Sequence, residues 1–226
     1  MIMASERTYQ FKRKFKLFAW FLLGYGIFYI FPNFYAPWTP SLLPLTWIDR
    51  NVSFLPWTFL IYTSDYLLIF LSILIINEES YFLRFSRMMF ATLVICGFFF
   101  LVFPTTYPRP TYPISNQWMV QAAMDLVYVA DTPNNCFPSM HVALTSVSAW
   151  SLRGCAPKYF KVFVIWALAI ILSTLTTKQH YFVDILGGLG VLVGVVALEE
   201  KFFFHYLRDF PKIAKNSKNS EFTKVF

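Results

Sequence analysis

Residues 57–76 read WTFLIYTSDYLLIFLSILII, and Asp65 is the one charged side chain among them. A helix needs about 20 mostly apolar residues to cross the hydrocarbon core of a membrane. We therefore interpret Trp57–Ile76 as a transmembrane helix. Further apolar runs with polar flanks predict spans at Leu17–Tyr35, Met88–Phe103, Ser139–Leu152, Phe160–Thr176 and Tyr181–Phe204. The sequence thus predicts an all-α, polytopic membrane protein with six transmembrane helices.

The composition of the whole chain supports this class. Of its 226 residues, 57% are hydrophobic and 14% are charged, whereas soluble domains average about 45–50% apolar and about 25% charged residues. The 27 Phe, 13 Tyr and 7 Trp argue against a disordered chain, a collagen-like fibre and a disulfide-stapled secreted module. The cysteines, Cys96, Cys136 and Cys155, have no CxxC or His-rich spacing, so we expect isolated thiols.

The distribution of basic residues predicts the orientation of the spans. Six spans place both termini on one face, and of the 19 Lys and Arg residues all but Arg50, Arg109 and Lys178 lie on that face. Because cytoplasmic segments are enriched in Lys and Arg, we expect both termini to be cytoplasmic. Frequent Asn, Lys, Ile and Phe favour a bacterial inner membrane. The net charge of +7 is then an orientation signal, and we expect membrane lipids rather than nucleic acid as partners.

Three segments reach the outer face, and each brings a polar group to it. After the third span, Arg109 lies between two prolines, which restrict the backbone on either side. Before the fourth span, the residues Pro138-Ser139-Met140-His141 place a proline where a helix can begin, with Ser139 and His141 in its first turn. Before the sixth span, His180 and Asp184 are four residues apart, so on a helix their side chains can touch.

This pattern is typical of a site for phosphoryl transfer. A carboxylate such as Asp184 that accepts one ring N–H of a histidine raises the nucleophilicity of the other ring nitrogen. A second histidine, His141, can supply a proton. Arg109, Lys178 and the Ser139 hydroxyl, together with free N–H groups at the start of the fourth span, form a cage for a tetrahedral dianion. Since these side chains can neutralise the transferred group, we expect no metal and no cofactor.

The same motifs resemble those of the type 2 phosphatidic acid phosphatase superfamily, which can be written KxxxxxxRP, PSGH and SRxxxxxHxxxD. The resemblance extends over the core from about residue 17 to residue 204, and it implies a six-helix membrane fold. It also implies that His180 is the nucleophile that forms a phosphohistidine. Asp184 would be its orienting partner, and His141 would be the acid that protonates the leaving oxygen and then activates water. Arg109 and Ser139 match phosphate-binding positions.

Three positions depart from the superfamily motifs. Met140 replaces the usual Gly but still offers its backbone N–H to phosphate. Val102 occupies the position of the first-motif Lys, and Ser173-Thr174 occupies that of the Ser-Arg pair. Lys178 is a substitute cation close to His180. The pattern also looks like the branch that contains inositol phosphorylceramide synthases, so hydrolysis and transfer to an alcohol both remain open.

We expect a membrane-embedded phosphatase that removes a phosphate from a lipid phosphate at the extracytoplasmic face, facing the periplasm or the cell exterior. The alternative is a lipid phosphotransferase. A channel or transporter would need polar residues along several spans, and a purely structural protein would not need two histidines and an arginine on one face. We expect three parts along the chain: a cytoplasmic basic arm over residues 1–16, a six-helix membrane catalytic domain over 17–204 and a cytoplasmic basic tail over 205–226. Within the tail, Lys212–Lys224 is expected to be loosely ordered.

Other polar and aromatic residues have simpler interpretations. Asp65 lies inside a span, so it serves either as a structural hydrogen-bond partner or as part of the substrate pocket. Asp125 and Asp131 are expected to be ordinary solvated carboxylates beside a surface helix over Ile114–Val129. Close helix packing is expected at Gly187, Gly188, Gly190 and Gly194, and outer-interface positions are expected for Trp38, Trp47, Trp57 and Trp118.

Overall fold

The structure is a computed structural model that describes residues 2–217, with side chains described from residue 12 to residue 201. The fold is all-α apart from two short strands, β1 (Ser41–Leu42) and β2 (Thr105–Thr106), which pair in parallel. The helical elements are α1 (Ile2–Tyr25), the π-helical turn η1 (Gly26–Ile30), α2 (Phe31–Phe34), α3 (Trp47–Asn51), the 3₁₀ turn η2 (Pro56–Thr58), α4 (Phe59–Tyr62), α5 (Asp65–Ile75), α6 (Glu79–Val102), α7 (Trp118–Ala130), α8 (Met140–Cys155), α9 (Pro157–Thr176) and α10 (Phe182–Ser217).

Five stretches of the described chain are long and apolar enough to cross a membrane. They are Lys12–Phe34, Pro56–Ile75, Glu79–Val102, Pro157–Thr176 and Phe182–Lys201. The prediction of six spans is therefore confirmed for five, and the fourth predicted span, Ser139–Leu152, is not among them.

The fourth predicted span corresponds to α8, a helix of only 16 residues. It packs against α5, α6, α9 and α10, and its first ten residues, Met140–Ala149, are all buried. A helix enclosed by other helices contacts protein rather than lipid, so it can carry Thr145, Ser146 and Ser148 on its buried surface. The central position of α8 explains why its composition is less apolar than that of its neighbours.

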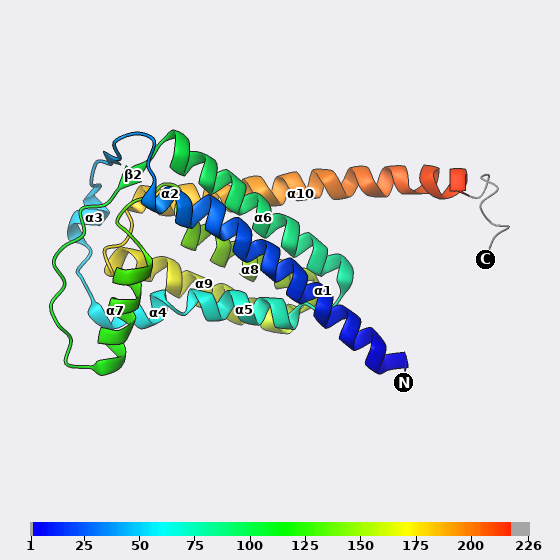
Figure 1. The fold of residues 1–226 in the computed structure, drawn as a ribbon, viewed down its shortest axis with the longest axis horizontal. Helices are drawn as coiled ribbons and strands as arrows, with labels where there is room; N and C mark the ends of the chain where they lie inside the picture. The colour runs from blue at the N-terminus through cyan, green and yellow to red at the C-terminus, as the bar shows by residue number, and fades with distance from the viewer. Residues whose placement is uncertain (1, 218–226) are drawn as a thin grey trace.

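The bundle has two distinct ends (Figure 1). The short elements α2, α3, α4 and α7 and the strands gather at one end, whereas α1 begins and α10 ends toward the other. The residue pairs Ser41 with Thr105 and Leu42 with Thr106 join the loop after α2 to the loop after α6. The motif-bearing loops are thereby held together at one end of the molecule.

Several helix boundaries differ from the prediction. α1 begins at Ile2, so residues 2–16 of the expected basic arm belong to the first helix, and α6 begins at Glu79 rather than at Met88. α7 confirms the predicted surface helix as a helix, but it begins at Trp118, four residues later. α10 runs past the predicted end at Phe204, and residues 218–224 of the expected loose tail lie outside the described residues. Charged residues such as Glu, Lys and Arg are good helix formers, so a helix continues where its apolar run ends.

α8 and α10 approach each other closely at Gly188. A Cβ atom placed at Gly188 would lie 2.7 Å from the carbonyl oxygen of Ser139, and one at Gly187 would overlap a neighbouring aromatic ring. Gly190 and Gly194 have nothing within 4 Å of such an atom. The prediction of close packing is thus confirmed at the first two glycines and wrong at the other two.

Gly188→Ala is expected to lower both stability and activity, whereas Gly190→Ala keeps both. The atom in the way at Gly188 is a backbone oxygen, so the added methyl group must push α8 and α10 apart. Such overpacking costs about 1–3 kcal/mol, and here it acts where the Ser139 N–H donates to the carbonyl of Asp184 at 3.0 Å. The melting temperature and turnover of the two purified variants check this, and equal values for both would contradict it.

Candidate active site

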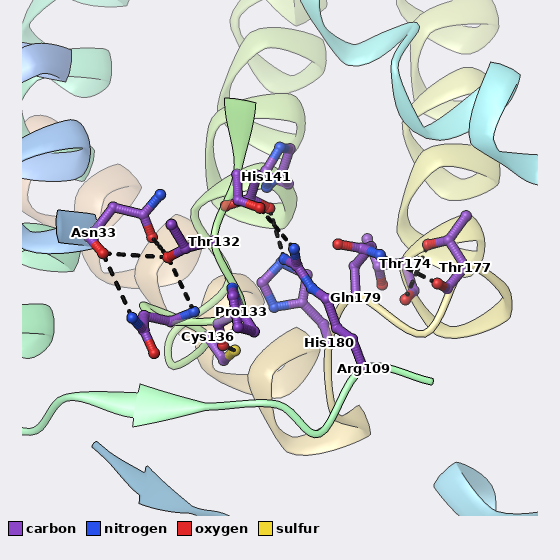
Figure 2. Close-up of polar contacts among 12 residues, drawn as sticks. Asn33, Arg109, Thr132, Pro133, Cys136, His141, Thr174, Thr177, Gln179 and His180 are labelled. Atoms are coloured by element: carbon purple, nitrogen blue, oxygen red, sulfur yellow. Dashed lines mark hydrogen bonds and ion pairs between the residues drawn. The ribbon is translucent and has the colours of Figure 1, made fainter. Parts of the chain in front are cut away.

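The predicted site residues come from three segments that the fold brings to one end of the bundle. Arg109 lies in the loop after β2, His141 is the second residue of α8, and His180 and Asp184 flank the start of α10. Figure 2 shows the side chains of Arg109, His141 and His180 gathered in one place. The ring centroids of His141 and His180 are 5.9 Å apart in an edge-to-face arrangement, so both rings can reach one reacting group placed beside them.

His180 and Asp184 contact each other as the sequence spacing predicts, but the two residues are not on one helix. α10 begins at Phe182, so His180 lies in the turn before it. Asp184 reaches back: its Oδ2 lies 3.3 Å from His180 Nδ1 and accepts a hydrogen bond from the backbone N–H of Tyr181 at 2.8 Å. Asp184 is fully buried. A carboxylate bound to Nδ1 leaves Nε2 of His180 as the nitrogen available for attack.

His141 is supported by two residues of the second predicted span. The Tyr62 hydroxyl lies 3.2 Å from both ring nitrogens, and Oδ2 of Asp65 lies 3.7 Å from Nε2. The span is interrupted between these residues because the hydroxyls of Thr63 and Ser64 bond to backbone carbonyls one turn back. Asp65 is 3% exposed. The second histidine therefore has a buried carboxylate of its own.

Arg109 is held by Asp131. Its Nη1 donates to the Asp131 carbonyl at 2.7 Å and its Nη2 to the carboxylate at 2.9 Å, while Nε is buried without a partner among the described residues. The Tyr29 hydroxyl donates to the same carboxylate. Burial by itself lowers the pKa of Arg109, but Asp131 opposes this and the net pKa is raised, so the guanidinium stays charged.

The interpretation of Asp131 as an ordinary solvated carboxylate is wrong. Only 8% of the residue is exposed, because the loop after α7 folds back against η1 and places the carboxylate between Arg109 and Tyr29. No sequence motif marks this residue, since its partners are 22 and 102 positions away. Asp125, in contrast, is exposed and accepts a hydrogen bond from Gln121 within α7.

Asp131→Ala is expected to lower turnover strongly and to destabilise the protein. The substitution leaves the buried guanidinium of Arg109 without its counter-ion, and removing one partner of a buried ion pair costs about 3–5 kcal/mol. Turnover and melting temperature of the purified variant check this. Asp125→Ala, which removes an exposed carboxylate from the same segment, serves as the control, and a loss of similar size in both variants would contradict the assignment.

Ser139 and Met140 are positioned by the start of α8. Ser139 is expected within the first turn but is the N-cap, one residue before α8 begins. Its Oγ accepts from the N–H of Val142 at 3.4 Å, and its own N–H donates to the carbonyl of Asp184. Both Ser139 and Met140 are buried. The fourth and sixth predicted spans are thus joined by a backbone hydrogen bond next to the two histidines.

The ammonium of Lys178 is bound away from the histidines. Nζ donates to the carbonyls of Asp49 at 2.9 Å and Val52 at 2.6 Å. Burial lowers the pKa of Lys178, although Asp49 acts in the opposite direction. The structure therefore does not bring this cation together with the other predicted phosphate ligands, and phosphate contact by Lys178 requires that it leave both carbonyls.

Two further residues beside the site carry no motif signal. Oδ1 of Asp49 accepts the N–H of Phe182 at 2.7 Å, so α3 caps the start of α10. Cys136 is buried, and its sulfur lies with one ligand atom each of His180 and Asp184 within a mutual distance of 4.8 Å. Burial, with Asp184 and Asp131 nearby, raises the pKa of the Cys136 thiol well above its usual range, so the sulfur is a neutral thiol.

An apolar cavity of about 170 Å³ lies beside His141, between α1, α5 and α8. Phe21, Ile69 and Leu144 form part of its wall, and Asp65 also lines it. The cavity therefore places an apolar wall directly beside His141.

The site combines the elements of phosphoryl transfer by a histidine. It has an oriented His180, a second buried histidine 5.9 Å away and a charged arginine beside them. A family model described as PAP2 superfamily matches residues 38–198, which include every motif residue above. No curated protein matches the chain.

Proposed function

The chain belongs to the PAP2 superfamily, and on that premise we propose that it is an integral-membrane lipid phosphatase that acts through a phosphohistidine. Membership by itself implies a phosphatase-like phosphoesterase that needs no metal. We propose, beyond this, a lipid substrate, a role for each site residue and an orientation in the membrane.

The observation that carries the proposal is the His180–Asp184 pair facing His141. Nε2 of His180 attacks phosphorus, and the bond from phosphorus to the ester oxygen breaks. His141 protonates that leaving oxygen and then removes a proton from water, which attacks the phosphohistidine and releases phosphate. Arg109, whose Nε is buried without a partner among the described residues, stabilises the negative charge on the transferred group.

A lipid substrate is supported by the apolar cavity next to His141. The cavity is lined by side chains of α1, α5 and α8, so an acyl or prenyl chain can lie within the bundle while its phosphate meets the two histidines. The hydrocarbon core of the bilayer is as apolar as this cavity, so a lipid chain can pass from one to the other without exposing apolar surface to water.

The proposed arrangement in the membrane has α8 as a sixth span inside a ring of five. Both termini are then cytoplasmic, and the site opens to the periplasm or the cell exterior. Three features support this orientation: the gathering of the short elements at one end of the bundle, the position of the helix ends at the other, and the excess of Lys and Arg there.

Phosphoryl transfer to an alcohol is the second candidate function. It is favoured by the small number of free cations at the site. Val102 and Ser173-Thr174 occupy the positions where the superfamily motifs have Lys and Ser-Arg. Of the two cations present, Arg109 is bound to Asp131 and Lys178 is bound to two carbonyls. A site with less positive charge around the phosphohistidine holds free phosphate less tightly.

Release of phosphate from a panel of lipid phosphates by the purified protein tests the proposal. We expect phosphate to appear without any added alcohol and to continue to appear in the presence of a chelator. Inositol or diacylglycerol is added in a parallel series. A labelled headgroup that moves onto the alcohol, with no phosphate in its absence, would identify a transferase instead, and a strict requirement for a divalent metal would contradict the assigned site.

A further inference from the structure

A second cavity, which is polar, lies at the end of the bundle remote from the two histidines. Its volume is about 300 Å³, and it is lined by Tyr81 and Arg84 of α6, Trp150 and Arg153 of α8, and Glu200 of α10. Arg153 is 12 residues from His141 along α8, which is about 18 Å at 1.5 Å per residue. We call this space the basal cavity, and neither the family match nor the proposed reaction gives it a role.

Arg84 is the unusual residue of the basal cavity. Its Nε atom is buried and has no hydrogen-bond partner among the described residues. Neighbouring arginines at this end have carboxylate partners, since Arg87 pairs with Glu199 and Arg13 with Glu79. No carboxylate within the described part of the chain lies within the 4 Å that would make an ion pair with Arg84. An enclosed N–H group without an acceptor costs free energy, so an anion from outside the chain fits here.

Arg153 brings a second guanidinium to the same space. Its Cζ lies 4.9 Å from the centroid of the Trp150 ring, a cation–π contact that orients the planar group. Tyr81 lies close to the last turn of α8, because a Cβ at Gly154 would be only 2.6 Å from the Tyr81 ring and 2.8 Å from its hydroxyl. The absence of a side chain at Gly154 therefore lets a phenol reach the cavity beside the two arginines.

We propose that the basal cavity binds a phosphate group through Arg84, Arg153 and Tyr81, apart from the catalytic site. Two guanidinium forks and a phenol match the oxygen acceptors of a phosphate, whereas an ammonium or neutral ligand would meet two like charges. Glu200 offsets one of the two charges and leaves the cavity net positive. The phosphate comes either from an anionic lipid headgroup, at the level where α6 begins and α8 ends, or from the surrounding solution.

Thermal unfolding of the intact protein in detergent tests the site, with His180→Ala as the background so that no substrate turns over. The probes are dioleoyl phosphatidylglycerol, inorganic phosphate and, as a zwitterionic control, dioleoyl phosphatidylcholine. We expect dioleoyl phosphatidylglycerol, inorganic phosphate or both to raise the melting temperature, and the increase to saturate as the probe concentration rises. Stabilisation by phosphatidylglycerol alone identifies a lipid headgroup, and stabilisation by inorganic phosphate as well identifies a site open to free phosphate.

Variants distinguish this cavity from the catalytic site, which also binds phosphate. Arg84→Gln and, separately, Arg153→Gln are each expected to weaken the apparent affinity about tenfold or more, since a hydrogen bond to a charged group contributes about 1.5–3 kcal/mol. Lys158→Gln removes an exposed cation near the same end and is expected to leave the affinity unchanged. Arg153 is exposed, so its variant stays informative even where Arg84→Gln does not fold. Equal affinities in all variants, or no stabilisation by either anion, would overturn the proposal.

Discussion

Replacing His180 by Ala is expected to abolish phosphate release, with turnover lowered by about 10⁴-fold or more, while the protein remains folded in the membrane. The substitution removes the nitrogen that is proposed to attack phosphorus, and loss of a nucleophile removes the covalent route altogether. The side chain is 5% exposed and makes one contact through Nδ1, to Asp184. The measurement is turnover of the purified variant on a lipid phosphate, normalised to folded protein.

Asp184→Asn and Arg50→Gln are the matched variants for this experiment. Asp184→Asn keeps the shape of the side chain but loses the charge that orients His180 and stabilises its positive form, so we expect a partial loss. Arg50→Gln removes an exposed cation from the short helix α3 and is expected to leave turnover unchanged. Full activity in purified His180→Ala protein would refute the phosphohistidine.

Replacing His141 by Ala is expected to lower turnover of a lipid phosphate by about 10²–10⁴-fold, the usual contribution of general acid–base catalysis. An alkoxide is a poor leaving group and needs the proton that His141 is proposed to supply. The loss is therefore expected to be much smaller with p-nitrophenyl phosphate, whose leaving group departs without protonation. Turnover of both substrates by the same purified variant gives the comparison.

Asp65→Asn separates the catalytic role of His141 from a purely structural one. The carboxylate lies 3.7 Å from His141 Nε2 and is buried, so its neutral replacement weakens the support of a positively charged His141. We expect a smaller loss than in His141→Ala, with the same dependence on the leaving group. An equal loss on both substrates in both variants would show that the two residues matter for folding rather than for proton transfer.

The local pattern of residues is sufficient for several features of the fold and the site. Long apolar runs predict membrane helices because a chain in lipid must satisfy its backbone hydrogen bonds internally, and five of the six predicted runs are confirmed as candidate spans. A proline before Ser139 predicts the start of α8, and the spacing of His180 and Asp184 predicts their contact. Each of these depends on residues within a few positions of one another.

Contacts between distant segments are not encoded in any local pattern. Asp131 follows a helix in the sequence as a surface carboxylate would, and only the return of its loop to η1 buries it against Arg109 and Tyr29. The role of Asp65 is ambiguous in the sequence for the same reason, since a carboxylate in a span must face protein but the sequence does not say which residue it contacts. Lys178 lies two positions from His180, yet its ammonium bonds to carbonyls more than 120 positions away.

The membrane class, the positions of the apolar helices and the two histidine motifs follow from the sequence without a structure, because hydropathy and short spacing act locally along the chain. The packing of distant segments decides that α8 is a short, enclosed helix and that Asp131 holds Arg109. It also decides that Nε of Arg84 is enclosed without a partner among the described residues. Charge pairing and burial depend on which segments pack together. That packing results from the fit of whole helices against one another, as at Gly188, where two backbones meet with no room for a methyl group.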